Sequence, residues 1–195
     1  MSLEEFKKAC IESKPDEVVD RFLIERPSYF FEQIQKDKEY EFKKDIACIL
    51  GVHIRDIVIV GSGKLGFSMK PDNSNAGLYP FLAFDGNEDK KSDIDIAVVS
   101  SLLFDKELQN LYNHTAFAKE NWATRSDLAK YMLKGRLVIR FLPGEFQFTK
   151  SIHTVQEKYR MEFSRDINIE IYKSWYYFET YHQQNVRSIQ VNLLA

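Results

Sequence analysis

Two aspartates separated by one residue are the feature of this sequence best suited to carry chemistry. Asp93 and Asp95 alternate with Ile94 and Ile96 in a segment that predicts a β-strand. Side chains two residues apart on a strand share a face, so both carboxylates would project together while the isoleucines enter the core. Neighbouring carboxylates repel each other, and a divalent cation such as Mg²⁺, which prefers oxygen ligands, removes that repulsion. A second interpretation remains open, in which both aspartates only solvate one face of an edge strand.

A glycine-serine turn precedes these aspartates in the chain. The continuous β-branched run Ile57-Val58-Ile59-Val60 predicts a buried strand, and it stops at Gly61 and Ser62. Glycine permits close approach of a backbone, and N–H groups together with a hydroxyl can bind phosphate oxygens. The following Gly-Ser-Gly-Lys is not a P-loop, because that motif needs a longer glycine loop before its lysine. The order of strand, turn and aspartate strand would let a phosphate group and a metal ion meet.

These motifs resemble the nucleotidyltransferase fold of DNA polymerase beta-like enzymes. The resemblance rests on Val60-Gly61-Ser62, on Gly66, and on Ser92-Asp93-Ile94-Asp95-Ile96. More narrowly, residues 59–105 resemble a group of bacterial nucleotidyltransferase-domain proteins. The matching stretches are Ile-Val-Gly-Ser-Gly-Lys-Leu-Gly-Phe-Ser, Ser-Asp-Ile-Asp-Ile-Ala-Val-Val-Ser and Leu-Phe-Asp, and the later Ile-Glu-Ile-Tyr-Lys-Ser-Trp is similar too.

The resemblance implies an enzyme that transfers a nucleoside monophosphate from an NTP to a hydroxyl group and releases pyrophosphate. Gly61 and Ser62 would bind the β and γ phosphates, and Asp93 and Asp95 would bind two Mg²⁺ ions. Lys64 could add a positive charge near the phosphates, or it could be a solvated loop lysine. The acceptor stays open: a protein side chain, a small molecule, a nucleotide or an RNA end.

The family usually supplies a third carboxylate from a later strand, as catalytic residue and metal ligand, and Glu170 is our candidate. It lies on the polar face of residues 166–172, which alternate with period two, although it could equally be an exposed strand glutamate. Many family members have aspartate there, and the separation of Ser62 from Asp93 is longer than is common. The insert could be a lid or only a loop. These departures keep a second hypothesis open: a weak or inactive nucleotide-binding partner protein, in a toxin–antitoxin or phage-defence pair.

The elements around these motifs predict an α/β (α+β) protein. Helices are expected between residues 2 and 51 (the last over 30–50), over 105–134, 151–163 and 174–194; strands over 57–60, 92–100, 136–141 and 166–172; a helical turn over 64–68; and a long loop over 69–91. We expect a nucleotidyltransferase-like fold with a short, mixed, twisted sheet flanked by helices. Residues 1–52 would be a helical segment packed on a domain of residues 53–195, together one compact domain.

Composition excludes some function classes. The formal net charge of −2 argues against bulk attraction to nucleic acid or to an anionic membrane, so a nucleic-acid-binding module is disfavoured. Cys10 and Cys48 belong to no zinc pattern and no signal peptide precedes them. No apolar run reaches the roughly 20 residues that span a bilayer. We therefore expect a soluble, cytoplasmic protein with no membrane partner.

Overall fold

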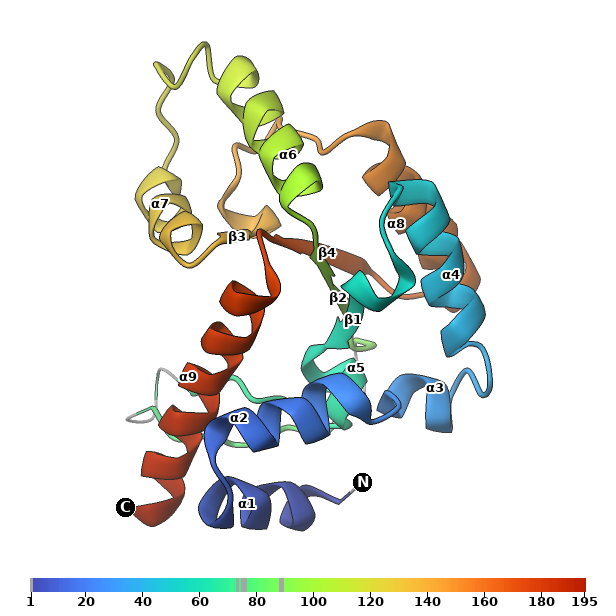
Figure 1. The fold of residues 1–195 in the computed structure, drawn as a ribbon, viewed down its shortest axis with the longest axis vertical. Coiled ribbons are helices and arrows are strands. Elements are labelled where there is room, and N and C mark those ends of the chain that lie inside the picture. Colours follow the sequence, from blue (N-terminus) through green and yellow to red (C-terminus); the bar gives the residue numbers. More distant parts are fainter. Residues whose placement is uncertain (1, 73, 75–76, 88–89) are drawn as a thin grey trace. The chain divides into compact units, whose positions relative to one another are not determined.

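The protein is a mixed α/β protein with a small sheet flanked by helices (Figure 1), which confirms the predicted class. The computed structural model describes residues 2–72, 74, 77–87 and 90–195. Its mixed sheet has the strand order β1-β2-β4-β3. The strands are β1 (Ile57–Val60), β2 (Ile94–Val99), β3 (Arg136–Leu137) and β4 (Ile167–Tyr172).

Helices precede, separate and follow these strands. They are α1 (Leu3–Glu12), α2 (Pro15–Val18), the π-helix η1 (Val19–Glu25), α3 (Tyr29–Gln33), α4 (Glu39–Leu50), the 3₁₀-helix η2 (Ile54–Asp56), α5 (Gly61–Leu65), α6 (Ser101–His114), α7 (Arg125–Leu133), the 3₁₀-helix η3 (Ile139–Phe141), α8 (Lys150–Phe163) and α9 (Trp175–Leu194).

The chain divides into two compact units that interleave along the sequence. The first unit comprises Met1–Phe42, Val58–Asp95 and Glu179–Ala195, and the second comprises Lys43–Ile57 and Ile96–Phe178. The predicted boundary near residue 52 stays a prediction. Each unit is described below by itself.

The first unit is built around a core of helices. The α1 helix starts where expected, because the Ser2 hydroxyl accepts a hydrogen bond of 3.1 Å from the Glu5 amide. Apolar side chains of α1, α2, η1, α5 and α9 meet in one buried cluster with the chain that follows α5. Burial of such surface is the main favourable term in folding. Its members are Phe6, Ala9, Cys10, Val18, Val19, Phe22, Leu23, Leu65, Phe67, Phe81, Val186 and Ile189.

The second unit places α6 and α8 against β4. Ile167, Ile169 and Ile171 are at most 4% exposed while the residues between them are half-buried, so the predicted alternation is confirmed as far as Ile171; Tyr172, expected on the polar face, is fully buried. The β3 strand pairs with β4 in antiparallel fashion, with Arg136 opposite Tyr172. This pairing positions the charged side chains of the two strands.

Two predicted helices are each divided in the structure. The helix expected over 30–50 is α3 and α4, and Asp37 between them has a φ of +64°, a left-handed conformation that ends helical hydrogen bonding. The helix expected over 105–134 is α6 and α7. Ala116, Phe117 and Ala118 follow α6 with φ values of +49°, +62° and +63°, so a continuous helix is impossible there.

Three shorter predictions also need correction. The strand expected over 136–141 ends at Leu137, and residues 139–141 form η3 instead. The strand expected over 92–100 is shorter, at Ile94–Val99. The helical turn expected over 64–68 is α5, which begins directly at Gly61. As a result, the whole glycine-serine motif lies inside a helix that starts where β1 ends.

The long connection between α5 and β2 folds back on its own beginning. Phe67 and Ala83 form an antiparallel bridge. The Phe84 amide donates to the Gly66 carbonyl at 2.8 Å, and the Ser68 amide donates to the Leu82 carbonyl at the same distance. Residues 73, 75–76 and 88–89 of this predicted loop lie outside the described residues. The chain from Leu82 to Phe84 is therefore anchored beside the end of α5.

Candidate active site

The two sequence motifs meet at Gly61 and Asp95 in the first unit. Gly61 has a φ of +66°, and a Cβ atom built on it would lie 2.6 Å from Oδ2 of Asp95. Real Cβ atoms do not approach another atom so closely, so only glycine fits here without a shift of the carboxylate. The backbone that opens α5 therefore contacts a carboxylate of β2 directly.

Asp95 lies in β2 and Asp93 directly precedes it, and both alternate with buried isoleucines as the sequence predicts. Ile94 and Ile96 are fully buried at 0% exposure, whereas both aspartates are half-buried. The Asp93 side chain is 34% exposed and lies 3.6 Å from the Lys90 ammonium. The isoleucines are therefore buried, while both aspartates keep part of their surface accessible.

A pair of hydrogen bonds closes the chain just before Asp93. The Asp85 amide donates to the Ser92 hydroxyl at 2.9 Å, and the Ser92 amide donates to Oδ1 of Asp85 at 2.8 Å. Sequence reasoning missed Asp85, although an aspartate followed by Gly86 is an ordinary turn signal. This reciprocal pair, the 85–92 clip below, fixes the chain that enters β2.

Ser62 and Gly63 follow Gly61 in the first turn of α5. Ser62 is half-buried, and its carbonyl accepts a hydrogen bond of 2.8 Å from the Gly66 amide. A Cβ on Gly63 would lie 3.5 Å from Cδ1 of Ile94, so the helix packs closely on β2. Ser62 therefore lies on the short helix that leads from the Gly61–Asp95 contact.

Lys64 has different partners from those expected of a phosphate-binding lysine. It is only 4% exposed. Its ammonium donates to the carbonyl of Ile24 at 3.4 Å and also to the carbonyl of Arg26. Both carbonyls lie at the C-terminal end of η1, so both of these hydrogen bonds go to backbone.

Glu170 lies in the second unit, where it pairs with Arg136. Arg136 is 5% exposed, and its guanidinium carbon lies 5.2 Å from the ring centre of Tyr131 and 5.0 Å from that of Tyr172. An arginine in such surroundings needs a counter-ion, because an isolated buried charge is costly. Glu170 supplies that counter-ion.

The donor chemistry of the aspartate pair fits Mg²⁺. This ion takes one or two carboxylates and completes its shell with water and phosphate oxygens, and Asp93 and Asp95 offer two half-buried carboxylates. Within residues 2–72, 74, 77–87 and 90–195, no group of three or more His, Cys, Asp or Glu side chains could hold a metal ion. A third protein ligand at Glu170 stays a prediction.

The aromatic run at the start of α9 has a structural role. The Trp175 indole N–H donates to Oδ1 of Asp56 at 3.2 Å, and Phe178 is fully buried against Tyr172. Together with Lys173 and His53, Trp175 borders an open pocket of about 420 Å³ in the second unit. These contacts tie the start of α9 to η2 and β4.

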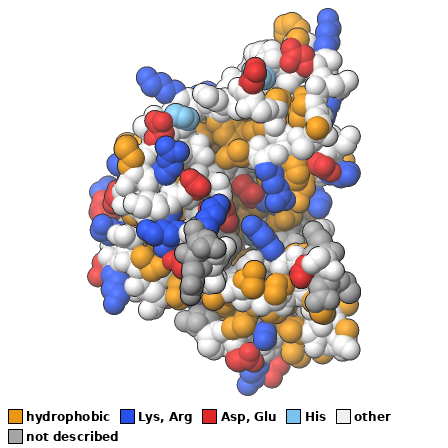
Figure 2. Space-filling model, turned by 180° about the vertical axis from the view of Figure 1, so that it is seen from behind, with side chains coloured by type: hydrophobic (Ala, Val, Ile, Leu, Met, Phe, Trp, Pro, Cys, Tyr) orange, Lys and Arg blue, Asp and Glu red, His pale blue; other side chains and the backbone are white. Residues whose placement is uncertain are grey.

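The surface carries both charge signs. On the face drawn in Figure 2, acidic and basic side chains lie interspersed with hydrophobic ones. Among the described residues, no helix combines the length and the apolar character needed to cross a bilayer.

Comparison of the chain with protein-family models, with curated proteins and with solved structures found no match.

Proposed function

We propose that this protein is a metal-dependent nucleotidyltransferase. The observation that carries the proposal is the contact between Gly61 and Asp95, where a Cβ on the glycine would lie 2.6 Å from the carboxylate. It joins a glycine-serine motif and a paired-aspartate strand, which are the two parts needed to hold a triphosphate and its cation. The fold we propose is the nucleotidyltransferase-like fold that the sequence resembles.

Each motif would have a distinct role. The backbone of Gly61 and the hydroxyl of Ser62 would bind the β and γ phosphates of an NTP, and Asp93 and Asp95 would hold Mg²⁺, two ions being expected. Bound there, Mg²⁺ would neutralise phosphate charge and orient the attacking and leaving oxygens. The half-buried position of both carboxylates supports this assignment, since Asp95 lies in β2, Asp93 directly precedes it, and both keep part of their surface accessible.

The reaction would be an in-line displacement. The oxygen of an acceptor hydroxyl forms a bond to the α-phosphorus, the bond from that phosphorus to the bridging oxygen breaks, and pyrophosphate leaves. The hydroxyl proton passes to water. Because little covalent chemistry falls to the protein, its contribution is positioning and charge stabilisation. The labelling experiment described below is designed to identify the acceptor: a protein, a small molecule, a nucleotide or an RNA end.

A second candidate function is favoured by the pairing of Glu170 with buried Arg136. A glutamate committed to this ion pair is poorly suited to serve as a third metal ligand. The protein would then bind nucleotide with little or no transfer, as a regulatory partner in a toxin–antitoxin or phage-defence pair.

Titration calorimetry with ATP, GTP, CTP and UTP, with and without Mg²⁺, tests the proposal. We expect metal-dependent binding of at least one NTP and its loss in Asp93→Ala/Asp95→Ala. Labelled NTPs in cell extract then separate the two candidates, because only a transferase passes label to an acceptor. Binding or labelling that is unchanged in the double variant would refute the proposed site.

A further inference from the structure

The position of α5 is set by close contacts at both of its ends. At its start, Gly61 contacts Asp95, and at its end Gly66 has a φ of +85° and a Cβ there would lie 2.7 Å from the ring of Tyr29. Between them, Gly63 packs on Ile94. A helix of five residues has little stability of its own. Its placement must therefore come from such contacts.

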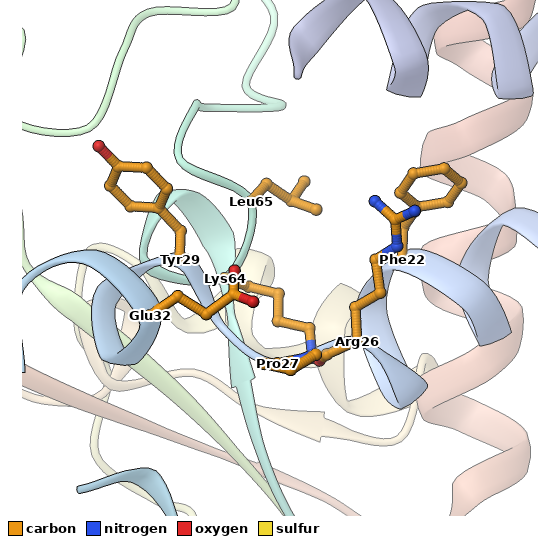
Figure 3. A pocket seen from close by; sticks show the side chains of 7 residues that line it. All are labelled: Phe22, Arg26, Pro27, Tyr29, Glu32, Lys64 and Leu65. Carbon is orange, nitrogen blue, oxygen red and sulfur yellow. The ribbon is translucent and has the colours of Figure 1, made fainter. Parts of the chain in front are cut away.

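Lys64 gives α5 a strongly polar contact with η1. Its side chain runs from α5 toward the backbone of Arg26 and Pro27 (Figure 3), in the wall of a pocket of about 140 Å³. The ammonium donates to the carbonyls of Ile24 and Arg26. The last carbonyls of a helix lack partners within it and carry partial negative charge, so they attract a cation.

This arrangement couples the end of η1 to the glycine-serine motif. Ser62 precedes Lys64 by two residues on the same helix, and the carbonyl of Ser62 accepts the Gly66 amide. The η1 helix is itself anchored, since the Arg26 guanidinium binds Glu5 of α1 at 2.5 Å and lies 4.8 Å from the ring centre of Phe22. A cation buried between two anchored elements resists displacement of either one.

We infer that Lys64 is a positioning residue: its ammonium caps the C-terminal end of η1 and thereby fixes Gly61 and Ser62 beside Asp95, without contacting phosphate. The inference rests on the proposed function for its catalytic consequence. The contact of Lys64 with η1 exists in the protein without any ligand. The role differs from the one expected from sequence, in which Lys64 would lie near the phosphates.

Amine-reactive labelling with mass spectrometry tests where the ammonium lies. In the native protein we expect Lys64 to stay unmodified while Lys8 and Lys90, with side chains 72% and 68% exposed, react. Addition of ATP and Mg²⁺ should leave the reactivity of Lys64 unchanged. A Lys64 that reacts as readily as Lys8, and that ATP then protects, would overturn the inference, because a phosphate ligand behaves in that way.

Substitution tests the coupling. Lys64→Met keeps the apolar stem, and we expect faster hydrogen exchange in residues 61–66 and 24–26 than in the wild type, with Lys64→Arg restoring much of the protection. Exchange in 61–66 that Lys64→Met leaves unchanged would refute the coupling.

Where the wild type is active, the rate of nucleotidyl transfer should fall in Lys64→Met by a factor on the order of 10², as for a small misplacement of reacting groups. Lys64→Arg should recover part of that rate.

The two proposals fail in different ways. A wild-type protein without metal-dependent NTP binding refutes the nucleotidyltransferase, whereas the labelling and exchange of the free protein still decide the role of Lys64.

Discussion

Oδ2 of Asp95 occupies the space in which any side chain on Gly61 would have to begin. The contact joins residues from two motifs that are far apart in the sequence. Glycine is therefore required at position 61 for two reasons: the left-handed backbone conformation and the neighbouring carboxylate.

Gly61→Ala should therefore be more harmful than an ordinary substitution of a left-handed glycine. Gly77 is the matched control, with a φ of +73° and no atom of the described residues within 4 Å of an added Cβ. Gly77→Ala should lower the free energy of unfolding by about 1–2 kcal/mol through backbone strain alone. Gly61→Ala should add the cost of displacing Asp95, a further ~1–3 kcal/mol, and should abolish metal-dependent NTP binding. Urea denaturation and calorimetry measure both effects, and equal losses in the two variants would contradict the contact.

Glu170→Gln should destabilise the second unit because it removes the negative charge that pairs with the guanidinium of Arg136. We expect the free energy of unfolding to fall by about 1.5–3 kcal/mol, as for a lost hydrogen bond to a charged group. Lys173 and Asp105 form an exposed control pair at 3.0 Å, and Asp105→Asn should cost well under 1 kcal/mol. If Glu170→Gln is as mild as the control and instead abolishes Mg²⁺ binding, Glu170 is a metal ligand and the second candidate function fails.

Asp45 should make stability depend on pH in the acid range. Burial raises the pKa of its carboxyl, but hydrogen bonds from Lys158 and Tyr159 outweigh burial and hold the pKa below its ordinary value of 3.8. Because the folded-state pKa is lowered, the ionised Asp45 carboxylate adds its full share to the free energy of unfolding above the unfolded-state pKa. This share is lost as the pH falls through the folded-state pKa. Asp45→Asn should therefore be less stable than the wild type at pH 7 by up to ~1 kcal/mol, and the difference should shrink below about pH 4.

Denaturation of both proteins between pH 2 and 7 measures this difference. The exposed pair of Asp127 with Lys130 is the control, and Asp127→Asn should change stability little at any pH. A gap between the wild type and Asp45→Asn that stays constant down to pH 2 would contradict the role assigned to the Asp45 carboxylate.

The two cysteines should differ in reactivity. Burial raises the pKa of the Cys10 thiol to about 12, and its side chain is fully buried in the core of the first unit, whereas Cys48 is exposed. Because the thiolate is the reactive form, a disulfide reagent at pH 8 should label Cys48 quickly and Cys10 only after unfolding in urea. Rapid native labelling of Cys48→Ser would show that the core around Cys10 opens readily.

Periodicity in the sequence predicted the elements with strong apolar patterns. The β1 strand, the alternating β4 strand and the long α9 helix lie close to where the pattern indicates, since burial of a face leaves a direct trace in residue order. The divisions at Asp37 and at residues 116–118 were not predictable in this way. Non-glycine residues there adopt left-handed backbone, and no glycine or proline announces it.

The candidate site shows the same distinction. The alternation of Asp93 and Asp95 with buried isoleucines is local and was predicted correctly. The contacts of Lys64 with η1 and of Glu170 with Arg136 join residues 38 and 34 positions apart. Such pairings depend on tertiary packing, which residue type and spacing along one segment do not encode.

The 85–92 clip fixes the position at which the chain enters β2. Because the two hydrogen bonds close the chain at Asp85 and Ser92, the entry into β2 is fixed independently of how many residues connect them. Closing a somewhat longer loop costs little extra free energy. The placement of β2 should therefore depend on Asp85 and Ser92, and we expect homologous chains to keep both clip residues.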